Sequence, residues 1–134
     1  MKVKIELKPT ISIGEEQIVK LTIIPAKHEA SVYGIEATAI FYRDNVEVHR
    51  ETKMITFKEG ESKTVEFKYK PDVKNSYTVK IQLKGAIEDY EKMATFMVDT
   101  SYERAFIVKE AIITEKIIYP VIAGVLIALL TQKR

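Results

Sequence analysis

Apolar and polar residues alternate along most of residues 1–100, and this period of two is typical of β-strands that bury one face. The alternating stretches are residues 3–7, 17–24, 34–42, 46–48, 54–57, 63–70, 77–84 and 92–98. None of them has the spacing of an amphipathic helix. The sequence therefore predicts a mainly β domain, a single antiparallel sandwich over residues 1–100. A barrel is the weaker alternative, because no up-and-down repeat is visible.

Turn-forming residues separate these strands. Gly14 with Glu15, Arg43 to Asn45, and Glu59 with Gly60 all have turn chemistry. Aromatic residues inside the strands are expected to fill the core rather than to stack on nucleic-acid bases, since the charges around them are balanced. These aromatic residues are Phe41, Phe67, Tyr69 and Phe96.

Residues 101–116 interrupt the alternation. Charged residues recur near positions 103–104, 109–110 and 115–116, with apolar residues between them. This spacing favours a helical stalk that continues into the residues beyond it, about 45 Å in total. The β-branched residues in the segment also allow an extra strand. We predict the helix, so that residues 101–134 form a second region: a long C-terminal α-helix that is hydrophobic at its end.

Residues 117–130 contain no charged side chain and form the most apolar stretch of the chain. As a helix they would rise about 21 Å, less than the roughly 30 Å hydrocarbon core of a bilayer. Lys133 and Arg134 follow the stretch and can lie among lipid headgroups. We predict a membrane span, and a helix buried in a protein assembly is the alternative. The residues assigned to this membrane or assembly helix are Ile117, Ile118, Tyr119, Pro120, Val121, Ile122, Gly124, Leu126, Ala128 and Leu130.

The N-terminal residues resemble no signal peptide, because charged and apolar residues alternate there without a long apolar run. A C-terminal hydrophobic helix without such a signal predicts tail-anchored topology. We therefore expect a membrane protein with a single C-terminal span, in a cell or virion membrane, and with the sandwich on the side where it was synthesised.

Charge and composition exclude several classes of function. The chain has 21 Lys and Arg against 19 Asp and Glu, and the excess of two lies after residue 100. This balance argues against a cationic nucleic-acid-binding surface. The chain has no cysteine, which excludes disulfides, thiolate metal sites and a cysteine nucleophile. Abundant Lys and Glu with few Asn and Gln are typical of proteins from hyperthermophiles.

Chemistry-bearing motifs are not found. No nucleophile elbow or phosphate-binding glycine loop is present. His28 and His49 have no second histidine at metal-ligand spacing, so we expect surface roles for both. The acidic residues 88–91 suit a solvated turn better than a calcium site, because they lack an alternating Asp or Asn ladder. We therefore predict no catalytic, cofactor-binding or metal-binding residue, no small-molecule substrate and no enzymatic activity.

Residues 57–71 and 75–81 resemble the late strands of immunoglobulin-like and fibronectin-III-like modules of prokaryotic cell surfaces, in particular the CARDB domains. The resemblance rests on a Gly-Glu-Ser-x-Thr-Val-x-Phe turn and strand and on a Tyr-x-Val-x-Ile strand. It implies an immunoglobulin-like sandwich in which Tyr77 forms a tyrosine corner. Such modules are usually exported and often tandem, and they imply no catalytic residues. The residues of this signature are Gly60, Thr64, Val65, Phe67, Tyr77 and Val79.

Two functions follow from these predictions. The first is a non-enzymatic structural protein, a membrane-anchored sandwich in a surface or virion (capsid) assembly of a thermophilic archaeon or its virus. The second is a tail-anchored adaptor or adhesion module that binds a protein partner through the sandwich, for example by strand addition. In either case the expected partners are a membrane or neighbouring hydrophobic helices, in a homo- or hetero-oligomeric assembly.

Overall fold

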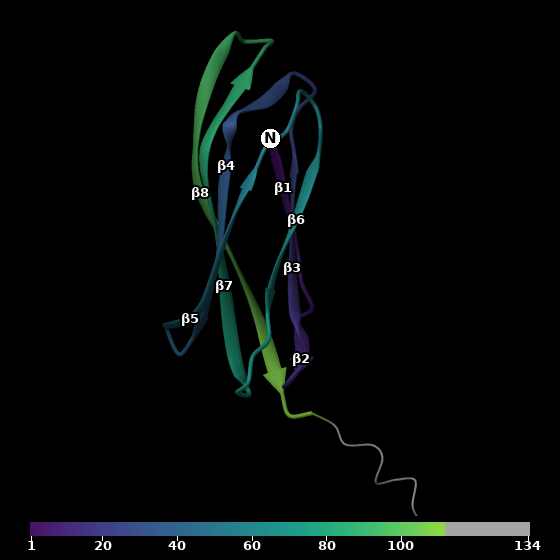
Figure 1. Ribbon diagram of the computed structural model, residues 1–134, viewed down its shortest axis with the longest axis vertical. Helices are drawn as coiled ribbons and strands as arrows, with labels where there is room; N and C mark the ends of the chain where they lie inside the picture. The colour runs from purple at the N-terminus through teal and green to yellow at the C-terminus, as the bar shows by residue number, and fades with distance from the viewer. Residues whose placement is uncertain (112–134) are drawn as a thin grey trace, which may run out of the picture.

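The computed structural model describes residues 1–111 and shows two β-sheets packed face to face (Figure 1). The predicted mainly β sandwich is confirmed. Its strands are β1 (Lys2–Glu6), β2 (Thr10–Ser12), β3 (Gln17–Ile24), β4 (Glu29–Arg43), β5 (Val46–Ile55), β6 (Lys63–Tyr69), β7 (Asn75–Asp89) and β8 (Ala94–Lys109).

The smaller sheet has the strand order β1-β3-β6, and the larger has the order β2-β8-β7-β4-β5. All pairs are antiparallel except β2 with β8. The chain therefore changes sheets between β1 and β2. Gln17 holds this crossing: its buried side chain accepts the Lys8 N–H at 3.1 Å and donates to the Lys8 carbonyl at 2.7 Å. Both backbone groups of the crossing residue are thus satisfied away from water.

The core lies between the sheets and follows from the alternation. Val19, Leu21 and Ile23 point inward from β3 and are fully buried. They pack against inward residues of the larger sheet, including Phe41 on β4 and Val79 on β7. Burying one apolar face from each sheet is what stabilises a sandwich of this kind.

A tyrosine corner closes one end of the core. The Tyr77 hydroxyl donates a hydrogen bond to the Val73 carbonyl at 2.6 Å, and its ring stacks on Phe106 with the centroids 5.3 Å apart. Immunoglobulin-like folds have the same geometry, in which a tyrosine near the start of a strand donates a hydrogen bond to the backbone of the preceding loop. Among the other signature residues, Gly60 has a φ of +69° in the turn before β6, and Phe67 is fully buried. Thr64 bonds the Thr22 hydroxyl at 2.9 Å.

Strand β4 contains a bulge where its pairing with β7 shifts between Val32 and Ile35. Tyr33 and Gly34 there have φ values of 62° and 106°. Gly85 of β7 lies directly against the bulge, since a Cβ on it would be 2.8 Å from the Gly34 carbonyl oxygen. The bulge therefore needs glycine on both strands, and it turns the end of β4 that carries Tyr33.

The helix predicted over residues 101–116 is wrong for its first part. Ser101 to Lys109 continue β8 as a strand, so the sandwich extends past the predicted boundary at residue 100. Residues 94–106 of this strand are exposed on most positions of both faces, which removes the alternation that identifies a strand. The two strands predicted over residues 46–48 and 54–57 are one strand in the structure: β5 runs from Val46 to Ile55, and Thr56 and Phe57 lie beyond its end.

The predicted membrane or assembly helix, residues 117–130, lies outside the described residues. Within residues 1–111, no helix has the length and hydropathy needed to cross a bilayer.

Candidate interaction surface

The edges of the two sheets differ in how their backbone groups are used. On one side, β5 and β6 lie next to each other, and side chains link them. Lys53 of β5 donates to the Glu66 carbonyl of β6, and Glu51 accepts the Lys68 N–H at 3.1 Å. The Lys53 ammonium also lies 5.8 Å from the centre of the Phe67 ring. We call this side, where inward-pointing charges occupy the strand edges, the closed edge.

β1 is a second kind of edge. It has five residues, and Lys2 and Lys4 are among them. Its one described partner is β3. Shortness and lysine side chains are the usual means by which a sheet edge avoids pairing with another chain.

β8 is a long edge strand that is paired on one side along almost its whole length by β7. On its other side β2 pairs with Ile107, Val108 and Lys109, and no other strand among residues 1–111 is hydrogen-bonded there. We call residues 94–106 of β8 the open edge. It is the longest edge without a strand partner in the described part of the chain.

Hydrogen bonds at the end of β8 show which backbone groups point to the open side. The Ile107 N–H donates to the Pro9 carbonyl at 2.9 Å, and the Lys109 carbonyl accepts the Ile13 N–H at 2.8 Å. Backbone groups of successive residues in a strand point to opposite sides. The odd-numbered residues 95–105 therefore direct their N–H and C=O groups away from β7, toward the open side.

A cluster of exposed apolar side chains lies at the end of the sandwich where β7 turns into β8. Tyr33, Met93 and Met97 are 98%, 85% and 81% exposed. The strand register places Val32, Ala86 and Met97 side by side across β4, β7 and β8. We name these exposed residues the tip cluster, in which Phe96 and Met97 are successive residues of β8 and lie on opposite faces of the sheet: Tyr33, Met54, Tyr90, Met93, Phe96 and Met97.

The expectation that Phe96 belongs to the core is wrong, because its side chain is 43% exposed at the open edge. Phe41 and Phe67 are fully buried as expected, and Tyr69 packs against the core. The tip cluster was missed because single apolar residues next to charged ones give no periodic pattern. Met93 and Met97, close together beside a predicted turn, were the available signal.

Residues 88–91, three of them acidic, run from the end of β7 into the turn of the β7–β8 hairpin. Asp89 accepts the backbone N–H groups of Glu91 and Lys92, both at 3.0 Å, and its carboxylate lies 3.4 Å from His28 Nε2. Burial acts to raise the pKa of Asp89, but the two amide hydrogen bonds and His28 outweigh it, so the pKa lies below its usual value. Asp89 thus orders the turn from a buried position, whereas Tyr90 and Glu91 after it are exposed.

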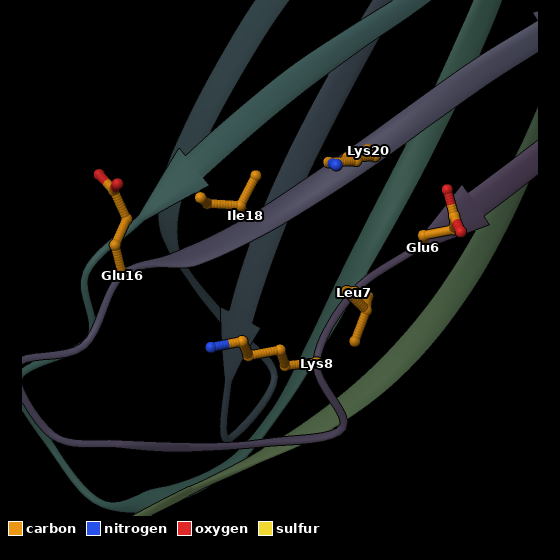
Figure 2. Close-up of a pocket in the computed structure, with 6 residues that line it drawn as sticks. All are labelled: Glu6, Leu7, Lys8, Glu16, Ile18 and Lys20. Carbon is orange, nitrogen blue, oxygen red and sulfur yellow. The ribbon is translucent and has the colours of Figure 1, made fainter.

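A shallow groove of about 320 Å³ lies on the small sheet beside the β1–β2 crossing (Figure 2). Two carboxylates and two ammonium groups surround the apolar side chains of Leu7 and Ile18 in it. Equal numbers of opposite charges give the groove no preference for a charged ligand. The lining residues are Glu6, Leu7, Lys8, Glu16, Ile18 and Lys20.

The second histidine, His49, is half-buried and stacks on Tyr69 with ring centroids 5.1 Å apart. It therefore packs beside the core rather than standing free at the surface. Across residues 1–111, no three His, Asp or Glu side chains gather closely enough to hold a metal ion.

Comparison with solved structures supports the fold. The crystal structure of the CARDB domain of a Pyrococcus furiosus protein, in complex with di-metal ions, is similar to this chain with a TM-score of 0.54 and 12% sequence identity. The similarity covers 81% of this chain and 92% of that chain. No protein-family profile matches the sequence, and no curated protein matches it. The chain therefore has a CARDB-like immunoglobulin-like fold, as the resemblance of residues 57–81 implied.

Proposed function

We propose that this chain is a non-enzymatic structural protein: a CARDB-like sandwich held at a membrane by residues 117–130 and acting through protein–protein contacts. Its setting is a surface or virion assembly, and the Lys- and Glu-rich composition fits a thermophilic archaeon or its virus. The alternative is a tail-anchored adaptor or adhesion module. Both functions use the sandwich as a binding module, and they differ in whether the partner is a further assembly subunit or a different protein.

The observation that carries the proposal is the contrast between the closed edge and the open edge. An open edge of this length exposes a row of unpaired backbone groups, which can pair with another polypeptide. The tip cluster adjoins it and supplies exposed apolar surface, which marks interaction sites in soluble domains. β8 runs from this end of the sandwich to the opposite end, where the chain reaches Lys109 (Figure 1). An anchor that follows Lys109 would therefore leave the tip cluster facing away from the membrane.

We do not extend the di-metal ions of the similar Pyrococcus furiosus domain to this chain. In the acidic segment at residues 88–91, Asp89 already accepts two backbone hydrogen bonds and pairs with His28. The Glu91 carboxylate lies beside the same histidine, with Oε1 3.9 Å from His28 Nε2. One buried carboxylate and one exposed one beside an imidazole do not supply the ligands that two metal ions need, so we propose no metal-dependent step.

Flotation of the full chain with neutral lipid vesicles in high salt tests the membrane part of the proposal. We expect the protein to float with the vesicles and the Val125→Lys variant to remain at the bottom of the gradient. A lysine at the centre of a membrane helix costs about 3 kcal/mol, which is enough to disfavour insertion of so short a segment.

The matched control is Val46→Lys, which makes the same change at a position on β5 that is 62% exposed. This variant should float like the unchanged protein. If Val125→Lys floats equally well, residues 117–130 do not anchor the chain. That result would contradict membrane anchoring in both the structural and the adaptor version of the proposal.

A further inference from the structure

The open edge has a definite length and midpoint. It begins at Ala94, where the hairpin turn ends, and stops before Ile107, where β2 takes over the pairing. Thr100 lies at the middle of residues 94–106. Its neighbours Asp99 and Ser101 direct their backbone groups to the open side, as the alternation along β8 requires.

We propose that the open edge is a self-association site: β8 pairs antiparallel with β8 of a second copy of this chain, about a twofold axis through Thr100. The pairing would join two five-stranded sheets into one continuous sheet. A twofold interface of this kind uses the same surface on both copies, so each residue contact occurs twice.

Length favours this register over its neighbours. An axis through Thr100 places residue 94 opposite residue 106 and so uses the whole open edge. Moving the axis toward either end leaves backbone groups unpaired on both copies. It also drives one strand into the hairpin turn or into β2, which already occupies the edge at Ile107. Each backbone hydrogen bond that is lost makes such a register less stable.

Charge favours the same register. About Thr100, Asp99 lies opposite Ser101 of the second copy, and no two like charges are directly opposed. An axis through Asp99 would oppose its carboxylate to its own copy, and an axis through Ser101 would oppose it to Glu103. Like charges directly opposite each other in a sheet are destabilising. A parallel pairing in register would bring Asp99 beside its own copy as well.

The remaining pairs about Thr100 are compatible. Arg104 lies opposite Phe96, which permits a cation–π contact at each end of the seam. Within each copy, Lys84 of β7 lies opposite Asp99. Lys80 lies opposite Glu103 in the same way. The lysines balance the acidic residues that the pairing gathers on the outer face.

The pairing also fixes the direction of the two copies. Because the strands are antiparallel, the two Lys109 ends point in opposite directions, about 60 Å apart. Copies anchored upright in one bilayer could not pair this way, whereas copies in facing membranes could. This last consequence rests on the proposed function, but the pairing itself does not.

Cysteine scanning of the full chain in mild detergent tests the register, because the natural chain has no cysteine. Five variants place one cysteine at each of positions 98, 99, 100, 101 and 102. Directly opposed residues have Cα atoms about 4.5–5.5 Å apart, within reach of a disulfide. With the axis at Thr100, the two copies of residue 99 or 101 are about 8–9 Å apart, too far for one. Mild oxidation should therefore give several-fold more covalent dimer for Thr100→Cys than for the other four.

Ser76→Cys is the matched control, since Ser76 is exposed on the same sheet but lies on β7, away from the open edge. A maximum at another position, an equal yield from Ser76→Cys, or no covalent dimer would each overturn the proposal. These outcomes are independent of vesicle flotation. A chain that floats without cross-linking contradicts the self-association alone, and one that cross-links without floating contradicts the anchor alone.

A charge pair gives a second readout in the Thr100→Cys background. Ser101→Asp opposes a new carboxylate to Asp99 of the other copy and should lower the dimer yield several-fold. Ser101→Lys opposes an ammonium group to the same carboxylate and should keep or raise the yield. Equal effects of the two substitutions would contradict the register, since both change the same exposed side chain to a charged one.

Discussion

The closed edge and the open edge of the sandwich differ in whether side chains cover their backbone N–H and C=O groups. At the closed edge, Lys53 and Glu51 each reach a backbone group of β6, so side chains occupy positions where another strand could bind. At the open edge, β8 presents outward N–H and C=O groups beside the exposed Phe96 and Met97. Protection of one side shows that the fold can block unwanted pairing. The unprotected side is therefore the one to which we assign the proposed contacts.

The largest expected effect compares an aromatic residue at each edge. Phe67 is fully buried below Lys53 at the closed edge, whereas Phe96 is partly exposed at the open edge. Phe67→Ala should lower the free energy of unfolding by about 3–5 kcal/mol, because it leaves a cavity in the core. Phe96→Ala should cost less than about 1 kcal/mol, as expected for a surface position. Urea unfolding followed by circular dichroism measures both, and equal costs would mean that the two edges do not differ.

The next effect opens the closed edge. Lys53→Met keeps the length of the side chain but loses the hydrogen bond to the Glu66 carbonyl, which should cost roughly 0.5–1.5 kcal/mol. It should also increase self-association through the β5–β6 side, visible by light scattering at high concentration. Lys68→Met, at an exposed position on β6, is the control and should do neither. Unchanged scattering for Lys53→Met would show that Lys53 does not guard this edge.

The smallest expected effect concerns the turn that begins the open edge. Asp89 has a lowered pKa in the folded state, so the unfolded chain binds its proton at a higher pH than the folded chain does. Its contribution is present above the usual value of 3.8 and is lost as the pH falls through the lower folded pKa. Asp89→Asn should therefore melt at a lower temperature near neutral pH and show a flatter decline below about pH 4. If the melting temperatures of the two proteins fell equally as the pH is lowered across that range, the result would contradict the role of Asp89.

The fold could be predicted where strands bury one face. β3 was predicted with its observed bounds, residues 17–24, because its buried and exposed positions alternate without exception until the strand ends. β5 and β8 could not be, since each lies at a sheet edge and large parts of both faces are exposed. Apolar and polar residues alternate in a strand because only one of its faces is buried. An edge strand whose two faces are both exposed to solvent does not need this alternation.

The candidate surface was hidden from the sequence for a related reason. Phe96 has the same local pattern as the buried aromatic residues, and its exposure depends on which parts of the folded chain pack over it. The bulge at Tyr33 and Gly34 is equally invisible, because it depends on the approach of Gly85 from a strand about 50 positions later. The sequence suggests strand addition as a way of binding a partner, but it does not show that β8 is the strand with a free edge.

The continuity of β8 has a mechanical consequence. One strand joins the tip cluster to the point where the chain leaves the sandwich, and it is hydrogen-bonded to β7 from Ala94 to Val108. A pull between a partner at the tip and an anchor beyond Lys109 would act along this strand. The hydrogen bonds to β7 lie across the line of force, so they would be loaded together in shear rather than opened one after another. The arrangement is suited to bearing tension.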